Sequence, residues 1–290
     1  MHKFLRAIGF SDITKKDLEM ILDEVITRPE IMKITKDSEG NEFAELSGSF
    51  AANAGITVRG TYQEDDSFHM DYYYPYVFGT SITTNEQIDV EKHAEKESYA
   101  GVCDEVNIGV TLIFYIQNVA DYLAETNRHL SKIHYGAMLA GLSTEGKILC
   151  PVVERKKNDV PAIQKNDRHN QLIAQAREGD EDAIESLTLE DMDTYALLSQ
   201  RVMKEDIFSI VKSTFMPFGI ESDQYTVLGE IIDCVTMENK LTHEKLYGMK
   251  LLCNNIQFDV CINEKDLLGE PAIGRRFRGN VWMQGNLCLE

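Results

Sequence analysis

The chain has 290 residues, which is enough for about two domains of ordinary size. Its 48 Asp and Glu side chains outnumber its 29 Lys and Arg side chains, so the formal net charge is −19. This acidic excess argues against a protein whose main task is to grip phosphate backbones, and we therefore expect no nucleic-acid partner for the chain as a whole.

Cysteine spacing and hydropathy indicate the cellular compartment of the protein. The closest pair of the six cysteines, Cys253 and Cys261, has seven residues between its members, which is not the spacing of a zinc site. We therefore expect free thiols in a reducing compartment, with no metal and no cofactor. The start of the chain turns polar too quickly for a signal peptide, and no stretch approaches the ~18 apolar residues of a membrane span. These features predict a cytoplasmic protein that does not contact the membrane.

The first predicted element is a helix that begins after Thr14 and ends at Pro29. Thr14 is followed three residues later by Asp17, which is a capping-box arrangement. The apolar positions that follow recur at helical spacing and would form one buried face: Leu18, Ile21, Leu22, Val25 and Ile26.

From residue 31 to about residue 153 the pattern is that of β-structure. A hairpin turn is expected at 37–41, a strand with alternating apolar side chains at 106–116, and a helix at 118–129. Residues 133–142 and 147–153 are expected to form another hairpin around the turn at 143–146. Short strands joined by turns of hairpin length favour an antiparallel α+β sheet over a doubly wound parallel one.

A polar bridge follows, and then a helical block. Its helices are expected to break at Gly179-Asp180, where Asp180 caps the next helix, and to end at 216–219. After it, short apolar segments with glycine at their corners predict a small closed barrel of OB-like type. The expected organisation is an α+β domain at 1–153, a linker and helical block at 154–220, and the barrel at 221–290.

One strand concentrates tyrosine side chains. Tyr72 and Tyr74 share a face in an extended chain, Tyr73 points the other way, and Pro75 confines the strand to a sheet edge or a strand end. An exposed row of tyrosines would be a binding surface, because tyrosine offers contact area at low entropic cost. The alternative is burial on both sides, between the sheet and a helix.

A second candidate site combines Arg275 and Arg278 with Trp282, the single tryptophan. Cationic and aromatic side chains on a barrel are the combination that binds single-stranded nucleic acid. However, residues 221–290 contain seven Lys and Arg against eleven Asp and Glu, so this part of the chain is itself acidic. Surface ion pairs around a buried tryptophan are the alternative, and nucleic acid is an unlikely partner.

Catalytic motifs are absent from the sequence. It contains no nucleophile elbow, no phosphate loop and no dinucleotide fingerprint, and its seven histidines are not spaced as metal ligands. Active sites can be assembled from distant residues, so a hydrolase that uses His69 and Asp71 remains an alternative. The leading hypothesis is a non-catalytic cytoplasmic protein that binds a protein or small-molecule partner, with Tyr72, Tyr74, Arg275, Arg278 and Trp282 as candidate binding residues. The oligomeric state stays open.

Three segments carry a family resemblance: the opening Met1–Phe10, the turn Gly179–Glu185 and the closing Gly279–Gly285. They resemble an uncharacterised family of Gram-positive anaerobic bacteria that is known only as a domain of unknown function. The similarity spans essentially the whole chain. It implies a bacterial cytoplasmic protein, and it brings no activity, cofactor or site residue with it.

Overall fold

The computed structural model describes residues 1–92, 96–128, 134–152, 172, 173, 175, 180, 182–187 and 211–289. The expected polar bridge and most of the expected helical block lie outside these residues. The expected end of the block is wrong, because Thr214–Pro217 form a strand. Within the described part, the Asp180 carboxylate accepts hydrogen bonds from the backbone N–H groups of Asp182 and Ala183. Residues 182–187 are helical, so Asp180 is the helix cap that the sequence predicts.

The helix predicted near the N-terminus forms where the local sequence places it. A short 3-10 helix, η1 (Lys3–Ile8), precedes helix α1 (Lys15–Thr27). The Thr14 hydroxyl accepts a hydrogen bond from the N–H of Asp17, and the helix buries Leu18, Ile21, Leu22 and Val25. Both the predicted cap and the predicted apolar face of this helix are confirmed.

Sheet A is a four-stranded antiparallel sheet in the order β1-β2-β3-β4. Its strands are β1 (Ile31–Lys36), β2 (Glu42–Ala51), β3 (Ala54–Tyr62) and β4 (Phe68–Val77). The hairpin predicted at 37–41 joins β1 to β2. It closes with Gly40 at φ +93°, the left-handed region that favours glycine. Pro75 lies on edge strand β4, as its missing N–H predicts.

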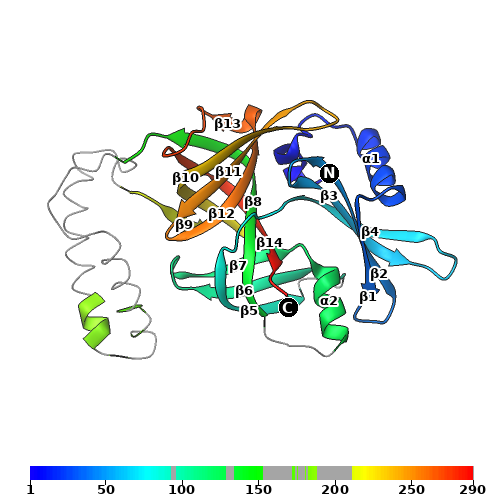
Figure 1. The fold of residues 1–290 in the computed structure, drawn as a ribbon, viewed down its shortest axis with the longest axis horizontal. Helices are drawn as coiled ribbons and strands as arrows, with labels where there is room; N and C mark the ends of the chain where they lie inside the picture. The colour runs from blue at the N-terminus through cyan, green and yellow to red at the C-terminus, as the bar shows by residue number, and fades with distance from the viewer. Residues whose placement is uncertain are drawn as a thin grey trace.

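Sheet B is a ten-stranded mixed sheet. Its strands are β5 (Thr84–Lys92), β6 (Tyr99–Glu105), β7 (Val110–Ile116), β8 (His134–Leu149), β9 (Thr214–Pro217), β10 (Gln224–Glu238), β11 (Lys245–Cys253), β12 (Ile256–Asn263), β13 (Leu267–Leu268) and β14 (Arg276–Leu287). Helix α2 (Val119–Asn127) and the 3-10 helix η2 (Glu264–Asp266) connect some of them. Figure 1 shows sheet A and α1 on one side of the long central strand β8. The described part of the chain is therefore mostly β, in the antiparallel sheet A and the mixed sheet B.

The OB-like barrel expected from residues 221–290 alone is not confirmed. Strand β14 pairs with β8 along almost its whole length, from Arg276 opposite Leu149 to Leu287 opposite Ala137. The pairings run from β8 through β12, β11, β10 and β14 back to β8, so the circuit of strands needs β8 to close. A second circuit runs from β8 through β5, β6, β7 and β14.

The hairpin expected around 143–146 is wrong. Strand β8 runs straight through this segment, because β14 supplies backbone partners on both sides of it. A register shift in β14 between Asn280 and Val281 accommodates the irregularity, and the Ser143 hydroxyl bonds the carbonyl of Asn280. Polar residues that are typical of a turn are thus held in a strand by a distant partner.

Candidate functional site

The tyrosines of β4 point into the molecule. Tyr74 is 2% exposed and Tyr72 is half-buried. Both hydroxyls accept hydrogen bonds from the guanidinium of Arg59 on the neighbouring strand β3, at 3.0 Å for Tyr72 and 3.2 Å for Tyr74. This geometry favours the burial interpretation of the tyrosine strand over an exposed binding row.

Arg59 is a fully buried cation whose donors are all directed at partners. Its Nε bonds Glu45 Oε1 at 2.7 Å and its Nη1 bonds the hydroxyl of Tyr115 at 2.7 Å. Its Nη2 bonds the carbonyls of Ile116 at 3.0 Å and Gln117 at 2.9 Å. These partners come from β2, β7 and the residue that follows β7, so Arg59 joins sheet A to sheet B.

The electrostatics keep Arg59 and its tyrosine partners in one protonation state. Burial opposes the charge of Arg59, but the surrounding Tyr115, Tyr74 and Glu45 hold its pKa well above the usual value. Burial also raises the pKa of the Tyr74 and Tyr115 hydroxyls, despite the neighbouring guanidinium. The tyrosines therefore stay protonated and the arginine stays charged. With five N–H groups already directed at acceptors, Arg59 has no donor left for a ligand, and we interpret it as a structural joint.

The C-terminal candidate residues do not form a common platform. Arg275 and Arg278 are exposed, whereas Trp282 is 6% exposed. The Trp282 indole N–H donates to Asp223 Oδ2 at 2.7 Å, and its ring stacks on Phe4 with centroids 5.3 Å apart. A nucleic-acid base can stack only on an exposed ring face. In this protein Trp282 stacks on Phe4 of the same chain instead.

His2 packs against the same tryptophan, with ring centroids 4.9 Å apart. Burial, together with the positive charges of Lys3 and the N-terminus, lowers the pKa of His2 from 6.5 to about 4. The neutral ring accepts a hydrogen bond from the N–H of Phe4 through Nδ1. Protonation of His2 therefore opposes folding of this corner of the molecule.

We expect the free energy of unfolding to fall as the pH drops from 6.5 towards 4, because the unfolded chain then binds a proton that folded His2 excludes. The His2→Asn variant keeps a side-chain acceptor for the N–H of Phe4 and does not titrate. Its free energy of unfolding should therefore change less between pH 6.5 and 4. Urea denaturation of both proteins at a series of pH values measures the difference. Parallel pH profiles would contradict this role of His2.

His69 and Asp71, the pair considered for hydrolysis, are not brought together. His69 is exposed on β4, and Asp71 lies 3.8 Å from the ammonium of Lys96. In the described part of the chain no hydrogen bond or ion pair joins His69 to Asp71. Neither residue lines any of the three surface hollows considered next.

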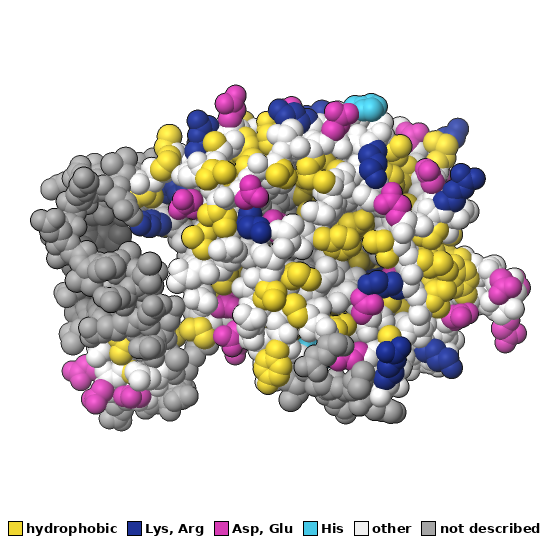
Figure 2. Space-filling view, in the orientation of Figure 1, with side chains coloured by type: hydrophobic (Ala, Val, Ile, Leu, Met, Phe, Trp, Pro, Cys, Tyr) yellow, Lys and Arg dark blue, Asp and Glu magenta, His cyan; other side chains and the backbone are white. Residues whose placement is uncertain are grey.

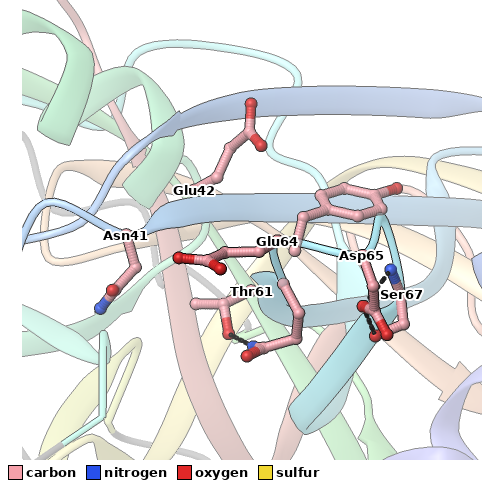
Figure 3. A pocket seen from close by; sticks show the side chains of 8 residues that line it. Asn41, Glu42, Thr61, Glu64, Asp65 and Ser67 are labelled. Atoms are coloured by element: carbon pink, nitrogen blue, oxygen red, sulfur yellow. Dashed lines mark hydrogen bonds between the residues drawn. The ribbon is translucent and has the colours of Figure 1, made fainter.

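Three open hollows surround the outer end of sheet A and helix α2. The largest, about 880 Å³, lies over the β3–β4 turn and the start of β2. Figure 3 shows its labelled carboxylates, Glu42 from β2 with Glu64 and Asp65 from the turn. The hollows of about 590 and 480 Å³ flank α2, and Arg128 lines both of them. These are open recesses at the surface and not enclosed cavities.

An apolar surface adjoins the largest hollow. We call it the outer face and define it by Met32, Ile34, Tyr62, Phe68 and Met70. Met32 is 50% exposed, Ile34 45% and Met70 38%, while Tyr62 and Phe68 are half-buried with ring centroids 5.2 Å apart. In Figure 2 hydrophobic side chains gather at this side of the molecule, next to the acidic tip of the β3–β4 hairpin.

The strand register shows that these side chains share one face of sheet A. Residues directly opposite in an antiparallel pair project from the same face. The cross-strand rows are Met32, Leu46, Val58 and Tyr73; Ile34, Ala44, Gly60 and Met70; and Lys36, Glu42, Tyr62 and Phe68. Helix α1 packs on this same face, because Val25 lies over Gly48, two positions along β2 from Leu46. The outer face is therefore the part of an apolar sheet face that α1 leaves uncovered.

Sequence reasoning missed this surface, although part of the residue pattern that forms it is visible within single strands. Met32 and Ile34 alternate with polar residues in the first strand, and Phe68 and Met70 do so in the fourth. Which face each strand turns towards α1, and how far α1 extends over it, depends on contacts between distant segments.

The fold and its exposed sheet face define a two-sheet, mostly β protein with an uncovered apolar surface. The chain belongs to the family described as "Domain of unknown function, E. rectale Gene description (DUF3881)", whose model matches residues 5–285. No curated protein and no solved structure matches the chain. The resemblance seen in the sequence is thus confirmed, and no activity accompanies it. Among the described helices, none is long and apolar enough to cross a membrane.

Proposed function

We propose that this protein is a non-catalytic binding protein and that the outer face of sheet A holds its partner. The observation that carries the proposal is the exposure of Met32, Ile34 and Met70 on one continuous face, beside two half-buried aromatic rings. Contiguous exposed apolar side chains with a polar rim are typical of interaction sites. A cytoplasmic location is part of the proposal, and it is supported by six free cysteines.

The outer face supports binding better than the groups considered for chemistry do. His69 and Asp71 are unconnected, and the buried Arg59 cluster is saturated by its own partners. Aromatic and methionine side chains, in contrast, are enriched at the centres of interfaces.

The test replaces apolar side chains of the outer face by polar ones that favour strands. The Ile34→Thr/Met70→Thr variant should lose at least one protein that the wild-type chain captures by cross-linking in extracts of its host, as identified by mass spectrometry. The folded state should be retained, because exposed substitutions typically change stability by about 0.5 kcal/mol or less. Thermal unfolding of the variant checks this point.

Leu268→Thr/Ile273→Thr is the matched control, since Leu268 is 70% and Ile273 69% exposed, outside sheet A. The control should capture the same proteins as the wild-type chain. If the outer-face variant also captures an unchanged set, the outer face is not the binding site and the proposal fails.

A further inference from the structure

We infer that the partner of the outer face is a short amphipathic helix whose polar side is cationic. This inference rests on the proposed function and adds the chemistry of the partner. Two independent features of the described residues carry it: the layer that α1 builds on this sheet face, and the sign of the charges around the uncovered part.

The layer favours a helix. Helix α1 already covers the inner part of the face through Leu18, Leu22 and Val25, and the outer face continues the same surface. From Met32 to Lys36 the strand advances ~13 Å at ~3.3 Å per residue, and four strands at ~4.8 Å spacing span ~14 Å. A helix ~10–12 Å wide fills such an area with about ten residues. A second helix beside α1 would complete the two-layer packing that buries a sheet face.

The charges favour a cationic helix. Exposed carboxylates border the outer face at Glu42, Glu64, Asp65 and Asp66, and Lys36 is the one cation in the same cross-strand rows. Tyr62 belongs to the outer face and also lines the 880 Å³ hollow with Glu42, Glu64 and Asp65. A Lys or Arg side chain at the edge of a bound helix would reach these carboxylates (Figure 3).

The same charges argue against a second copy of this chain as the occupant. A symmetric dimer through the outer face would place the same patch of both copies together. Glu42, Glu64 and Asp66 of both copies would then border one interface, and like charges at an interface oppose association. The net charge of −19 adds to this repulsion.

The experiment uses the full chain and two fluorescent peptides. One is an amphipathic peptide of Leu, Ala and Lys, about 14 residues long, and the other has every Lys replaced by Glu. Fluorescence anisotropy at low salt should show binding of the Lys peptide and none of the Glu peptide. Added salt should weaken binding, because the charges lie at an exposed rim. The Ile34→Thr/Met70→Thr variant should lose the binding.

Matched charge variants separate this site from a general attraction to an acidic protein. Glu42→Gln/Glu64→Gln/Asp66→Asn removes three charges at the rim, and Asn suits the left-handed backbone of Asp66, with φ +61°. Glu19→Gln/Asp23→Asn/Glu24→Gln removes three exposed charges from α1. The rim variant should weaken binding of the Lys peptide about tenfold, because three rim ion pairs are lost. The α1 variant should weaken binding of the Lys peptide by less than about twofold.

Equal losses in the two charge variants would overturn the inference, since binding would then follow net charge alone. Binding of the Glu peptide as tightly as the Lys peptide would overturn it as well. Failure of the Lys peptide to bind, while a host protein still requires Ile34 and Met70, would refute the cationic helix and leave the proposed function standing. If the Ile34→Thr/Met70→Thr variant still binds the Lys peptide and still captures every host protein, both the cationic helix and the proposed function are refuted.

Discussion

Replacing Arg59 with Met should lower the free energy of unfolding by about 3–5 kcal/mol, the usual effect of removing one partner from a buried ion pair. The substitution leaves the Glu45 carboxylate only 4% exposed and without its cation. It also removes the donor from the hydroxyls of Tyr72 and Tyr115 and from two carbonyls next to α2. Urea or guanidinium denaturation, followed by circular dichroism, measures the loss.

Two further variants make the Arg59 result specific. Arg275→Met removes an arginine whose side chain is exposed and bonds one backbone carbonyl, so it should change stability by about 0.5 kcal/mol or less. Adding Glu45→Gln to Arg59→Met should cost less than the sum of the two single effects, because the amide removes the unpaired charge. A loss below about 1 kcal/mol in Arg59→Met would show that the joint between the sheets does not depend on this arginine.

The Trp282→Ala substitution should lower the free energy of unfolding by about 3–5 kcal/mol, as expected for a large buried aromatic side chain. Trp282 packs among Phe4, His2 and Tyr115, so its removal leaves a cavity where η1 meets strand β14. The carboxylate of Asp223 also loses the indole N–H. Circular dichroism must follow the unfolding, because no other tryptophan is present.

Trp282→Phe is the control for this prediction. It retains most of the apolar volume and loses the hydrogen bond to Asp223, so it should cost about 1–2 kcal/mol. The wild-type tryptophan should emit at short wavelength and shift to longer wavelength on unfolding. An emission typical of water-exposed indole in the folded protein, or a stable Trp282→Ala variant, would contradict the burial of this ring.

Local sequence signals predicted several local elements, although residues 106–109 of the strand expected at 106–116 form the turn between β6 and β7. The Thr14 cap, the apolar face of α1 and the 37–41 hairpin each depend on a few adjacent residues, so their sequence patterns predict them. Pro75 on an edge strand follows from the missing N–H of proline, which no central strand tolerates. The helix expected at 118–129 is also present, as α2.

Long-range pairing explains where the local signals failed. Residues 143–146 have the composition of a turn, yet β14 holds them in a strand from more than a hundred residues away. The same pairing joins the expected C-terminal barrel to strands from the first half of the chain. Period and turn chemistry describe one strand at a time, and they carry no information on which distant strand becomes its neighbour.

For the candidate sites too, some features follow from the sequence and others only from the tertiary structure. By itself the sequence determined an acidic chain with α+β patterning and a recognisable family resemblance, and it placed Tyr72 and Tyr74 on a common strand face. Only the tertiary structure decided that this face closes around Arg59, that Trp282 is buried by Phe4, and that Met32, Ile34 and Met70 remain exposed. The physical reason is that burial depends on the neighbours of a side chain, and here those neighbours come from distant strands and from the limited reach of helix α1.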